Sequence, residues 1–184
     1  MVKHALRVLL AAAVVLGLYT GYLFATGNFH TVIAGQLYRS GQPTAERIAE
    51  WRKRYGIKTI VNLRGAHPDQ EWYLIERAVA RELGVTLIDY PISAKREVTP
   101  DQVEELLALL GAAEPPVLIH CLDGADRSGL VAAFYIAGVA HGSEYYAEFQ
   151  LTPFYGHLPV WFLPYFAMDR SFENAEPRLG FPDS

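Results

Sequence analysis

The sequence predicts an α/β fold in which a central, mostly parallel sheet is flanked by helices and preceded by one N-terminal transmembrane helix. Three observations lead to this prediction. Segments typical of strands and of helices alternate from about residue 29 to residue 184. The strand-like segments are short apolar runs, as in buried parallel strands. An uncharged apolar segment, Val8–Ala25, stands in front of them.

The composition is that of a folded protein of about one domain. The chain has 184 residues, of which 51% are hydrophobic and 20% are charged, far from the composition of disordered chains. Its 16 Lys and Arg against 20 Asp and Glu give a net charge of −4. This charge excludes recruitment by bulk electrostatics, and we predict no nucleic-acid partner. The single cysteine, Cys121, excludes an internal disulfide framework and a cysteine-rich metal cluster.

The apolar segment Val8–Ala25 predicts a membrane anchor. At about 1.5 Å per residue, a helix of this length comes close to spanning the ~30 Å hydrocarbon core of a bilayer. The segment is longer than the apolar region of a typical signal peptide, and Tyr22, Leu23 and Phe24 make a poor cleavage site. We therefore predict an uncleaved signal anchor, with a cleaved signal peptide as the alternative.

Charges on either side of this segment predict its orientation. Lys3 and Arg7 precede it, and the next Lys or Arg after it is Arg39. The positive-inside rule then keeps the N-terminus in the cytoplasm. In a bacterium this predicts a single-pass protein of the inner membrane with the domain that follows the segment on the periplasmic side. The predicted division is a cytoplasmic stub plus signal anchor over residues 1–28 and one domain over residues 29–184.

The first half of this domain contains two predicted helices and two predicted strands. A helix is expected over Thr44–Arg54, and the run Thr59–Leu63 (TIVNL) predicts a buried strand. A second helix is expected over Asp69–Leu83, with Asp69 as its N-cap. Val85–Tyr90 (VTLIDY) predicts the next strand.

The second half begins with a strong helix start at Thr99-Pro100-Asp101-Gln102, which has a capping Thr, Pro at the first helical position and Gln at the capping-box position. Val117–Ile119 predicts a third buried strand, and an apolar helix is expected from Ser128 to about Ala140. An aromatic-rich helical tail is predicted after it, covering the core. In an alternative interpretation, the stretch Pro159–Phe166 of this tail rests on the membrane, because Trp and Tyr favour its interface.

The predicted functional site is the segment His120–Gly129 (HCLDGADRSG), which joins an apolar strand to an apolar helix. In such a turn, successive backbone N–H groups can surround one anion at the positive end of the helix. The same groups would stabilise a thiolate at Cys121. Arg127 offers a planar fork that matches two phosphate oxygens. This combination suits nucleophilic attack on a phosphate monoester.

Three further residues of the segment have supporting roles in this prediction. Gly124 permits the tight curl of the loop. Ser128 donates a hydrogen bond to the thiolate. His120 anchors the end of the strand and orients the cysteine through its ring N–H.

The pattern H-C-x5-R-S-G resembles the signature of the cysteine-dependent protein tyrosine and dual-specificity phosphatase superfamily. The segments LYRSGQPT (37–44), IKTIVNLRG (57–65) and PVLIHCLDGADRSG (116–129) are similar to compact bacterial dual-specificity-like phosphatases. The resemblance implies a fold like that of protein tyrosine phosphatases and Cys121 as nucleophile. It also implies that phosphate is held by Arg127 together with the loop residues Leu122, Asp123, Gly124, Ala125 and Ser128.

The resemblance leaves the general acid open. Dual-specificity phosphatases typically supply an Asp from a separate loop, and the corresponding segment here, residues 91–97, contains none. Asp126 resembles the loop Asp of relatives whose signature contains the pair Asp-Arg, and it is the predicted acid. Asp89 is the first alternative, and three other carboxylates share the remaining possibilities, namely Glu97, Asp101 and Asp123.

Basic residues near the expected mouth of the site are candidates for binding a second anionic group of the substrate, and an ordinary surface charge is the alternative for each of them. Arg64 is the favoured one, since it ends a strand at the side of the sheet where ligands of α/β proteins bind. The others are Arg39, Lys95 and Arg96. No metal and no cofactor are predicted, because His67, His141 and His157 show no ligand spacing.

The sequence therefore predicts a metal-independent phosphomonoester hydrolase that acts through a cysteinyl-phosphate, of the tyrosine or dual-specificity type. A phosphate-binding module without a working acid is the first alternative. Sulfur transfer of the rhodanese type is disfavoured, because five residues separate Cys121 from Arg127. The predicted partners are the membrane and a phosphorylated substrate, which the sequence leaves open among phosphoproteins, phospholipids and phosphosugars.

Overall fold

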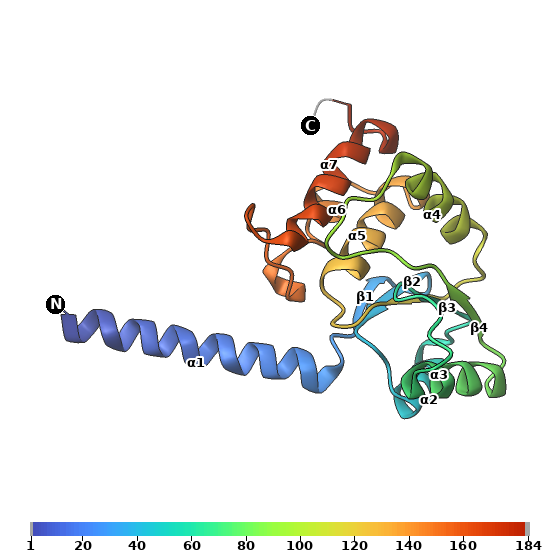
Figure 1. The fold of residues 1–184 in the computed structure, drawn as a ribbon, viewed down its shortest axis with the longest axis horizontal. Helices are drawn as coiled ribbons and strands as arrows, with labels where there is room; N and C mark the ends of the chain where they lie inside the picture. Colours follow the sequence, from blue (N-terminus) through green and yellow to red (C-terminus); the bar gives the residue numbers. More distant parts are fainter. Residues whose placement is uncertain (1, 183–184) are drawn as a thin grey trace.

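The computed structural model describes residues 2–182, which form an α/β domain with a long helix in front of it (Figure 1). Five strands form one mixed sheet in the order β1-β2-β5-β3-β4. β1 pairs with β2 in antiparallel orientation, and the other neighbouring strands are parallel. The α/β prediction is confirmed. The strands are β1 (His30–Ile33), β2 (Leu37–Ser40), β3 (Thr59–Asn62), β4 (Thr86–Asp89) and β5 (Val117–His120).

The hairpin of β1 and β2 lies outside the strands that the sequence predicts. β2 is buried along its whole length, yet two of its four residues are the polar Arg39 and Ser40. It therefore shows neither the apolar run nor the alternation that identifies a strand from sequence. Its register beside β5, with Arg39 opposite Ile119 and Ser40 opposite His120, brings these two polar residues to the start of the loop after β5.

Helices cover both faces of the sheet (Figure 1). The lower layer in the view is α2 (Ala45–Tyr55) and α3 (Glu71–Glu82), and the upper layer contains α4 (Pro100–Ala112), α5 (Asp126–Phe134) and α7 (Ala167–Leu179). The remaining short elements are η1 (Tyr135–Val139), α6 (Glu144–Glu148), η2 (Pro153–Tyr155) and η3 (Pro164–Phe166).

The core is divided by the sheet, because successive residues of a strand point to opposite faces. In β5, Leu118 belongs to the cluster with Ile48 and Trp51 of α2, whereas Ile119 belongs to the cluster with Leu106 of α4. β5 is buried throughout. The loop that follows it is therefore mounted on a rigid central strand.

Helix starts follow their capping residues. The predicted capping box at Thr99 is confirmed, with the Thr99 side chain accepting from the Gln102 N–H and the Gln102 side chain accepting from the Thr99 N–H. The predicted Asp69 cap is wrong. Residues His67–Gln70 form a turn in which the Gln70 N–H donates to the His67 carbonyl, so α3 starts only at Glu71.

The helix α1 (Val2–Thr26) projects away from the domain (Figure 1). An 18-residue window within His4–Thr26 has a mean hydropathy of 2.1, and this segment is long and apolar enough to cross a membrane. Signal sequences near an N-terminus share these properties. Leu23, near the end of α1, is buried against the domain.

The C-terminal tail covers the core through α7. The ring of Phe172 lies 6.3 Å from that of Phe134 in α5, centroid to centroid. The stretch before α7 behaves differently, since Trp161 is 77% and Phe162 is 68% exposed. The tail thus combines a core-covering helix with an exposed aromatic segment.

Candidate active site

The loop between β5 and α5 lies at the carboxyl end of a central parallel strand, where α/β folds usually place ligands. Cys121 begins this loop and is buried, and the neighbouring His120 and Ser128 are fully buried. The Gly124 N–H donates to Cys121 Sγ at 3.3 Å, and Ser128 Oγ lies 3.6 Å from the same sulfur. The first turn of α5 follows directly, so that its unpaired N–H groups and positive dipole end lie beside the thiol.

Backbone carbonyls of the loop point away from the thiol and find donors behind it. The Leu122 carbonyl accepts from the Gln42 N–H at 2.9 Å, and the Asp123 carbonyl accepts from Asn28 Nδ2 at 2.9 Å. In a trans peptide unit the carbonyl and the next N–H point in opposite directions. Each carbonyl bonded at the back therefore turns one N–H toward the front, as the Gly124 N–H bonded to the sulfur illustrates.

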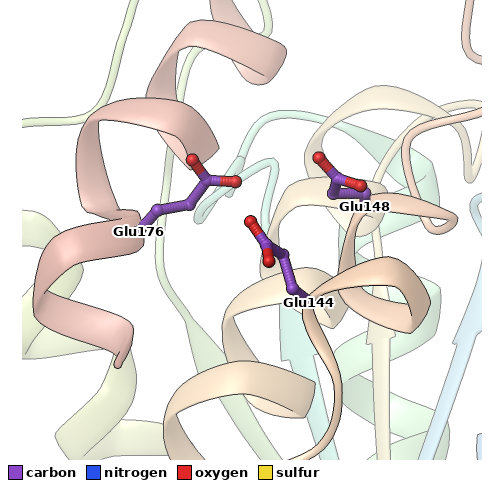
Figure 2. A group of neighbouring side chains, drawn as sticks. All are labelled: Glu144, Glu148 and Glu176. Atoms are coloured by element: carbon purple, nitrogen blue, oxygen red, sulfur yellow. The ribbon is translucent and has the colours of Figure 1, made fainter. Parts of the chain in front are cut away.

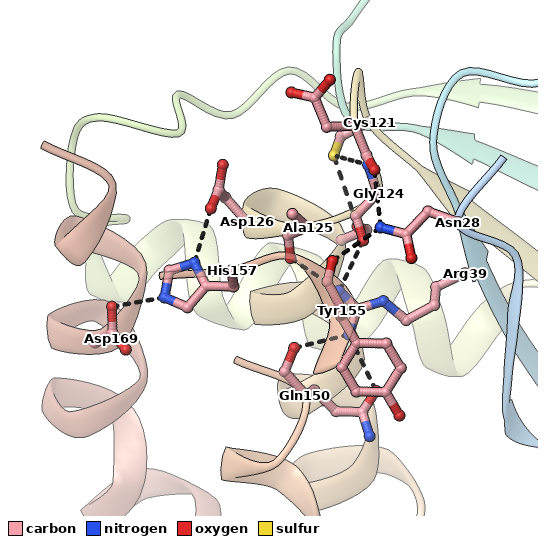
Figure 3. A network of polar contacts seen from close by, with 12 residues as sticks. Asn28, Arg39, Cys121, Gly124, Ala125, Asp126, Gln150, Tyr155, His157 and Asp169 are labelled. Atoms are coloured by element: carbon pink, nitrogen blue, oxygen red, sulfur yellow. Dashed lines mark hydrogen bonds and ion pairs between the residues drawn. The ribbon is translucent and has the colours of Figure 1, made fainter. Parts of the chain in front are cut away.

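Arg39 supplies the next two donors. Its Nη2 donates to the Gly124 carbonyl at 2.9 Å and to the Ala125 carbonyl at 2.8 Å, and its Nη1 donates to the backbone and side-chain oxygens of Gln150 (Figure 3). The guanidinium also lies 4.2 Å from the centre of the Tyr155 ring. Arg39 has no solvent exposure. Its predicted contact with substrate at the mouth is therefore wrong, because it lies beneath the loop.

Arg39 nevertheless remains a cation at neutral pH. Burial lowers its pKa to about 10, while Tyr155, Cys121 and Asp126 act in the opposite direction. A positive charge is thus fixed below the loop. It favours negative charge both on the thiol and on a bound anion.

Arg127 belongs to the same pocket as Cys121. It lines a pocket of about 330 Å³ together with Cys121, Leu122, Asp123 and Asp126. One of its terminal nitrogens, Nη1, donates to the Leu63 carbonyl at 3.3 Å. Its Nε is buried and has no hydrogen-bond partner among residues 2–182. The pocket is therefore lined by the residue that carries the buried thiol and by an arginine whose Nε has no hydrogen-bond partner in the described chain.

The remaining basic residues expected near the mouth lie in three different places. Lys95 lines the pocket, and its Nζ lies 5.6 Å from the centre of the Tyr165 ring, which also lines it. Arg96 lines a neighbouring pocket. Arg64 is held beside the site, because it donates to Gln42 Oε1 at 2.7 Å and stacks 3.5 Å above the Trp72 ring.

His120 is held from the layer of α3. Its Nε2 lies 2.6 Å from Oε1 of Glu76, and both side chains are buried. Glu76 Oε2 accepts from Gln42 Nε2 at 2.9 Å. His120 Nδ1 lies 3.4 Å from the Cys121 carbonyl. A buried acid on α3 therefore joins the end of β5 to the segment after β2, and nothing in the local sequence around Glu76 indicated this.

Asp126 takes part in a charge network around a buried histidine that the sequence did not indicate. Its Oδ1 lies 2.7 Å from His157 Nδ1, and His157 Nε2 lies 2.9 Å from Asp169 Oδ2 (Figure 3). His157 has no solvent exposure. Burial alone would lower the pKa of His157, but its hydrogen bonds to Asp126 and Asp169 and their charges raise it to about 9. His157 is thus an imidazolium at neutral pH.

The other candidate acids occupy different places. Asp123 lines the pocket, and burial, followed by the charge of Asp126, raises its pKa. Asp89 accepts from Asn62 Nδ2 at 2.8 Å and from the Tyr73 hydroxyl at 2.5 Å, and the residues lining the pocket within the described chain do not include it. Glu97 accepts from Arg170 and Asn174 of α7. Of the candidate acids, all of which lie in the described chain, Asp126 and Asp123 are the two that line the pocket together with Cys121.

A group of three acidic residues lies elsewhere. Glu144 and Glu148 of α6 and Glu176 of α7 bring oxygens within 4.8 Å of one another (Figure 2). Within the described chain, the residues lining the Cys121 pocket include none of them. Because exposed acidic groups are common without a bound cation, we assign no metal site to them.

The amino-acid sequence matches a known family and a curated relative. Residues 27–156 match the family model described as a DSP-PTPase phosphatase fused to NAD+ kinase. The dual specificity protein phosphatase TpbA of Pseudomonas aeruginosa (strain UCBPP-PA14) is 37% identical over 101 residues, which are 54% of this chain and 42% of TpbA. The chain thus aligns with less than half of the length of this curated relative.

Solved structures extend the similarity to the fold. The crystal structure of P. aeruginosa TpbA is 27% identical, with a TM-score of 0.67 over 86% of this chain and 93% of TpbA. A TpbA variant in complex with pTyr is 25% identical, with a TM-score of 0.65 over the same shares. The core catalytic domain of the PP-IP phosphatase SIW14 from S. cerevisiae is 21% identical and has a TM-score of 0.60 over 84% of this chain and 93% of that domain; it supports the fold alone.

Proposed function

We propose, since the chain belongs to the DSP-PTPase family of cysteine-dependent phosphatases, that it hydrolyses phosphomonoesters through a cysteinyl-phosphate formed on Cys121. The observation that carries this proposal is the pocket that is lined both by Cys121, with its buried thiol, and by Arg127, whose Nε has no hydrogen-bond partner within residues 2–182. A loop whose carbonyls are bonded at the back supports it, because the N–H groups then remain for a phosphate. The fixed charge of Arg39 adds to the attraction.

In the first step, the thiolate of Cys121 attacks phosphorus. The S–P bond forms, the ester P–O bond breaks, and the loop N–H groups and Arg127 hold the oxygens of the transferred phosphoryl group. The departing oxygen needs a proton. Asp126 is the acid that we propose, because it lines the pocket and is bonded to a protonated histidine.

His157 completes the supply of protons in this mechanism. Asp126 takes the Nδ1 proton of the imidazolium along the 2.7 Å contact and passes it to the leaving oxygen, so that His157 becomes neutral and the charge of Asp126 is unchanged. In the second step, a water loses a proton to the Asp126–His157 pair and its oxygen attacks phosphorus. The S–P bond then breaks, which releases inorganic phosphate and restores both the thiolate and the imidazolium.

We propose a phosphorylated tyrosine or a dual-specificity protein substrate. The relative of known structure in complex with pTyr supports this choice. At the mouth of the pocket, Leu122 is 52% and Tyr165 is 37% exposed, so that an aromatic leaving group would find apolar contacts. Lys95 at the same mouth is available to an acidic residue beside the phosphorylated one.

The experiment that tests this function measures release of inorganic phosphate by the full chain in detergent. Peptides with phosphotyrosine and phosphoserine, a phosphorylated glycerolipid and a sugar phosphate are compared, with and without EDTA. We expect the phosphotyrosine peptide to be turned over fastest, no effect of EDTA, and no turnover by Cys121→Ser, because a serine hydroxyl is a far weaker nucleophile. Retention of more than about a tenth of the activity by Cys121→Ser would exclude the covalent mechanism.

We also propose that residues 1–28 are a cytoplasmic stub plus signal anchor in the inner membrane, and that residues 29–184 form the phosphatase domain on the periplasmic side. The apolar segment Val8–Ala25 of α1 and the basic Lys3 and Arg7 in front of that segment support this. A reporter that is active only in the periplasm, fused after Ser184, should be active. Activity of a cytoplasm-only reporter at the same position would reverse the topology.

A further inference from the structure

The connection between α1 and the phosphatase domain is short and enters the site directly. Thr26 ends α1, and Gly27 is the single residue between it and Asn28. The Gly27 carbonyl accepts from the Gly41 N–H at 2.8 Å. Asn28 is 97% shielded from solvent, with 3% of its surface exposed. The end of the apolar helix is thus joined to the loop region without a flexible linker.

The backbone of Asn28 is held in an uncommon conformation. Its φ of 49° lies in the left-handed region, which Asn tolerates better than most residues. Its N–H donates to the Leu23 carbonyl at 2.7 Å, near the end of α1. This backbone conformation sets the direction in which the Asn28 side chain leaves the main chain, and so the position of its amide group.

The side chain of Asn28 uses both of its donors on backbone carbonyls. Nδ2 donates to the Asp123 carbonyl at 2.9 Å and to the Tyr155 carbonyl at 2.8 Å (Figure 3). Oδ1 faces His30 Nε2 at 2.8 Å. An amide offers two N–H donors and one acceptor in this arrangement, whereas a carboxylate offers acceptors only.

The bond to the Asp123 carbonyl has a consequence at the thiol. This carbonyl and the Gly124 N–H belong to one peptide unit and point in opposite directions. The donor that holds the carbonyl back therefore aims the Gly124 N–H at Cys121 Sγ, 3.3 Å away. Asn28, two residues after the end of α1, is thus connected to Cys121 Sγ through a single peptide unit, the one between Asp123 and Gly124.

We propose that Asn28 is a positioning residue for the phosphate loop, which fixes the Asp123–Gly124 peptide so that its N–H faces the thiol, and which thereby makes the end of α1 part of the active-site framework. The proposal rests on the proposed function for its kinetic consequences. Its structural consequence, the affinity of the loop for an anion, does not depend on turnover.

Two variants of the full chain in detergent test this role. Asn28→Gly keeps access to the left-handed backbone and removes only the side chain. Asn28→Asp keeps the shape and replaces the two donors by an oxygen that faces two carbonyls. Arg47→Ala is the matched control, because Arg47 donates to the Ala25 carbonyl of the same junction at 2.7 Å and, within residues 2–182, makes no hydrogen bond to the phosphate loop.

Three quantities are measured for each protein, far below its melting temperature. They are the dissociation constant of inorganic phosphate, the pH dependence of Cys121 alkylation by iodoacetamide, and kcat and KM for a phosphotyrosine peptide. We expect Asn28→Gly to weaken phosphate binding about 10-fold, as for the loss of one buried hydrogen bond, and to move the midpoint of alkylation to higher pH. Asn28→Asp should be affected more strongly, and Arg47→Ala should match the wild type in all three quantities.

The outcomes separate this proposal from the proposed function. Wild-type phosphate affinity, alkylation profile and kcat/KM in both Asn28 variants would overturn the positioning role and leave the phosphatase activity untouched. If the wild type binds phosphate without turning over any ester, the proposed function fails, while weaker binding by Asn28→Gly still supports the positioning role. Equal losses in Arg47→Ala and the Asn28 variants would show a general effect of the junction and overturn the specific role of Asn28.

Discussion

The base and the rim of the phosphate loop are held by different kinds of group. The base consists of Asn28, Arg39 and the backbone N–H of Gln42, which donate to four consecutive loop carbonyls. The rim consists of Asp126, His157 and Asp169. The imidazole of His157 lies between the two carboxylates, 2.7 Å from that of Asp126 and 2.9 Å from that of Asp169. The base lies on the side of α1 and the β1–β2 hairpin, whereas the rim ties α5 to the C-terminal tail.

This difference separates two tasks of the site. Donors of the base are an amide, a backbone N–H and a guanidinium that remains charged at neutral pH, so the shape of the anion site does not change over the neutral range. The rim contains a histidine whose pKa is raised to about 9 and which can exchange protons with Asp126. We infer that the base governs phosphate binding and the rim governs proton transfer. Variants on each side should therefore fail in different ways.

The largest effect is expected from Arg39→Met in the base. The change leaves the Gly124 and Ala125 carbonyls without a charged donor and removes the cation beneath the loop. Hydrogen bonds to charged groups contribute about 1.5–3 kcal/mol each, so the unfolding free energy should fall by about 3 kcal/mol or more. Turnover of every substrate should be lost at all pH values. Chemical denaturation and phosphate release measure the two effects.

Arg170→Met is the control for this change. Arg170 is a partly exposed arginine paired with Glu97, and a surface pair contributes about 0–1 kcal/mol. It should retain stability and activity. If Arg39→Met keeps more than about a tenth of the wild-type turnover, the base does not need its buried cation, and the division of tasks is wrong.

An intermediate effect is expected from Asp126→Asn in the rim. If Asp126 protonates the leaving oxygen, turnover of a tyrosyl or alkyl phosphate should fall by ~10²–10⁴. The loss should be much smaller for p-nitrophenyl phosphate, whose leaving group needs little protonation, and phosphate affinity should change little. Asp89→Asn is the comparison, because Asp89 is bonded to Asn62 and Tyr73. A loss that depends on the leaving group in Asp89→Asn, with a uniform loss in Asp126→Asn, would assign the acid to Asp89.

Sequence reasoning succeeded where the determining contacts are local. The capping box of α4 involves Thr99 and Gln102, three residues apart, and it was predicted in full. The strand before the Cys121 loop is a short apolar run whose burial agrees with its composition. The position of the loop between a strand and a helix was predicted for the same reason, and the resemblance to the family followed from a contiguous pattern.

The base and the rim could not be predicted, because their contacts join residues far apart in sequence. Asn28 is 95 residues from Asp123, and Arg39 is 85 residues from Gly124. His157 lies 31 residues after Asp126, within an aromatic tail that has no ligand spacing. A buried arginine also contradicts the general rule that charged residues stay outside, so the sequence placed Arg39 at the mouth. The similarity of the segment LYRSGQPT (37–44) to related phosphatases was the one sequence signal close to Arg39.

The smallest effect concerns stability against pH and separates the rim from the base without any assay of turnover. The pKa of His157 is raised from 6.5 to about 9 in the folded protein. A group with a raised folded pKa contributes stability that is complete below pH 6.5 and is lost as the pH rises through about 9. The wild type should therefore lose unfolding free energy over this window, at no more than about 1.4 kcal/mol per pH unit. His157→Gln should be less stable at pH 6.5, and its unfolding free energy should depend less on pH. His67→Gln, at an exposed histidine, should retain the wild-type slope.

Arg39 stays charged over most of this range because its pKa is about 10, so the base contributes little to the slope. Denaturation curves at several pH values test this prediction. If the unfolding free energies of the wild type and of His157→Gln depend equally on pH, His157 is not charged between the two carboxylates. The rim could then not supply the proton for the leaving oxygen.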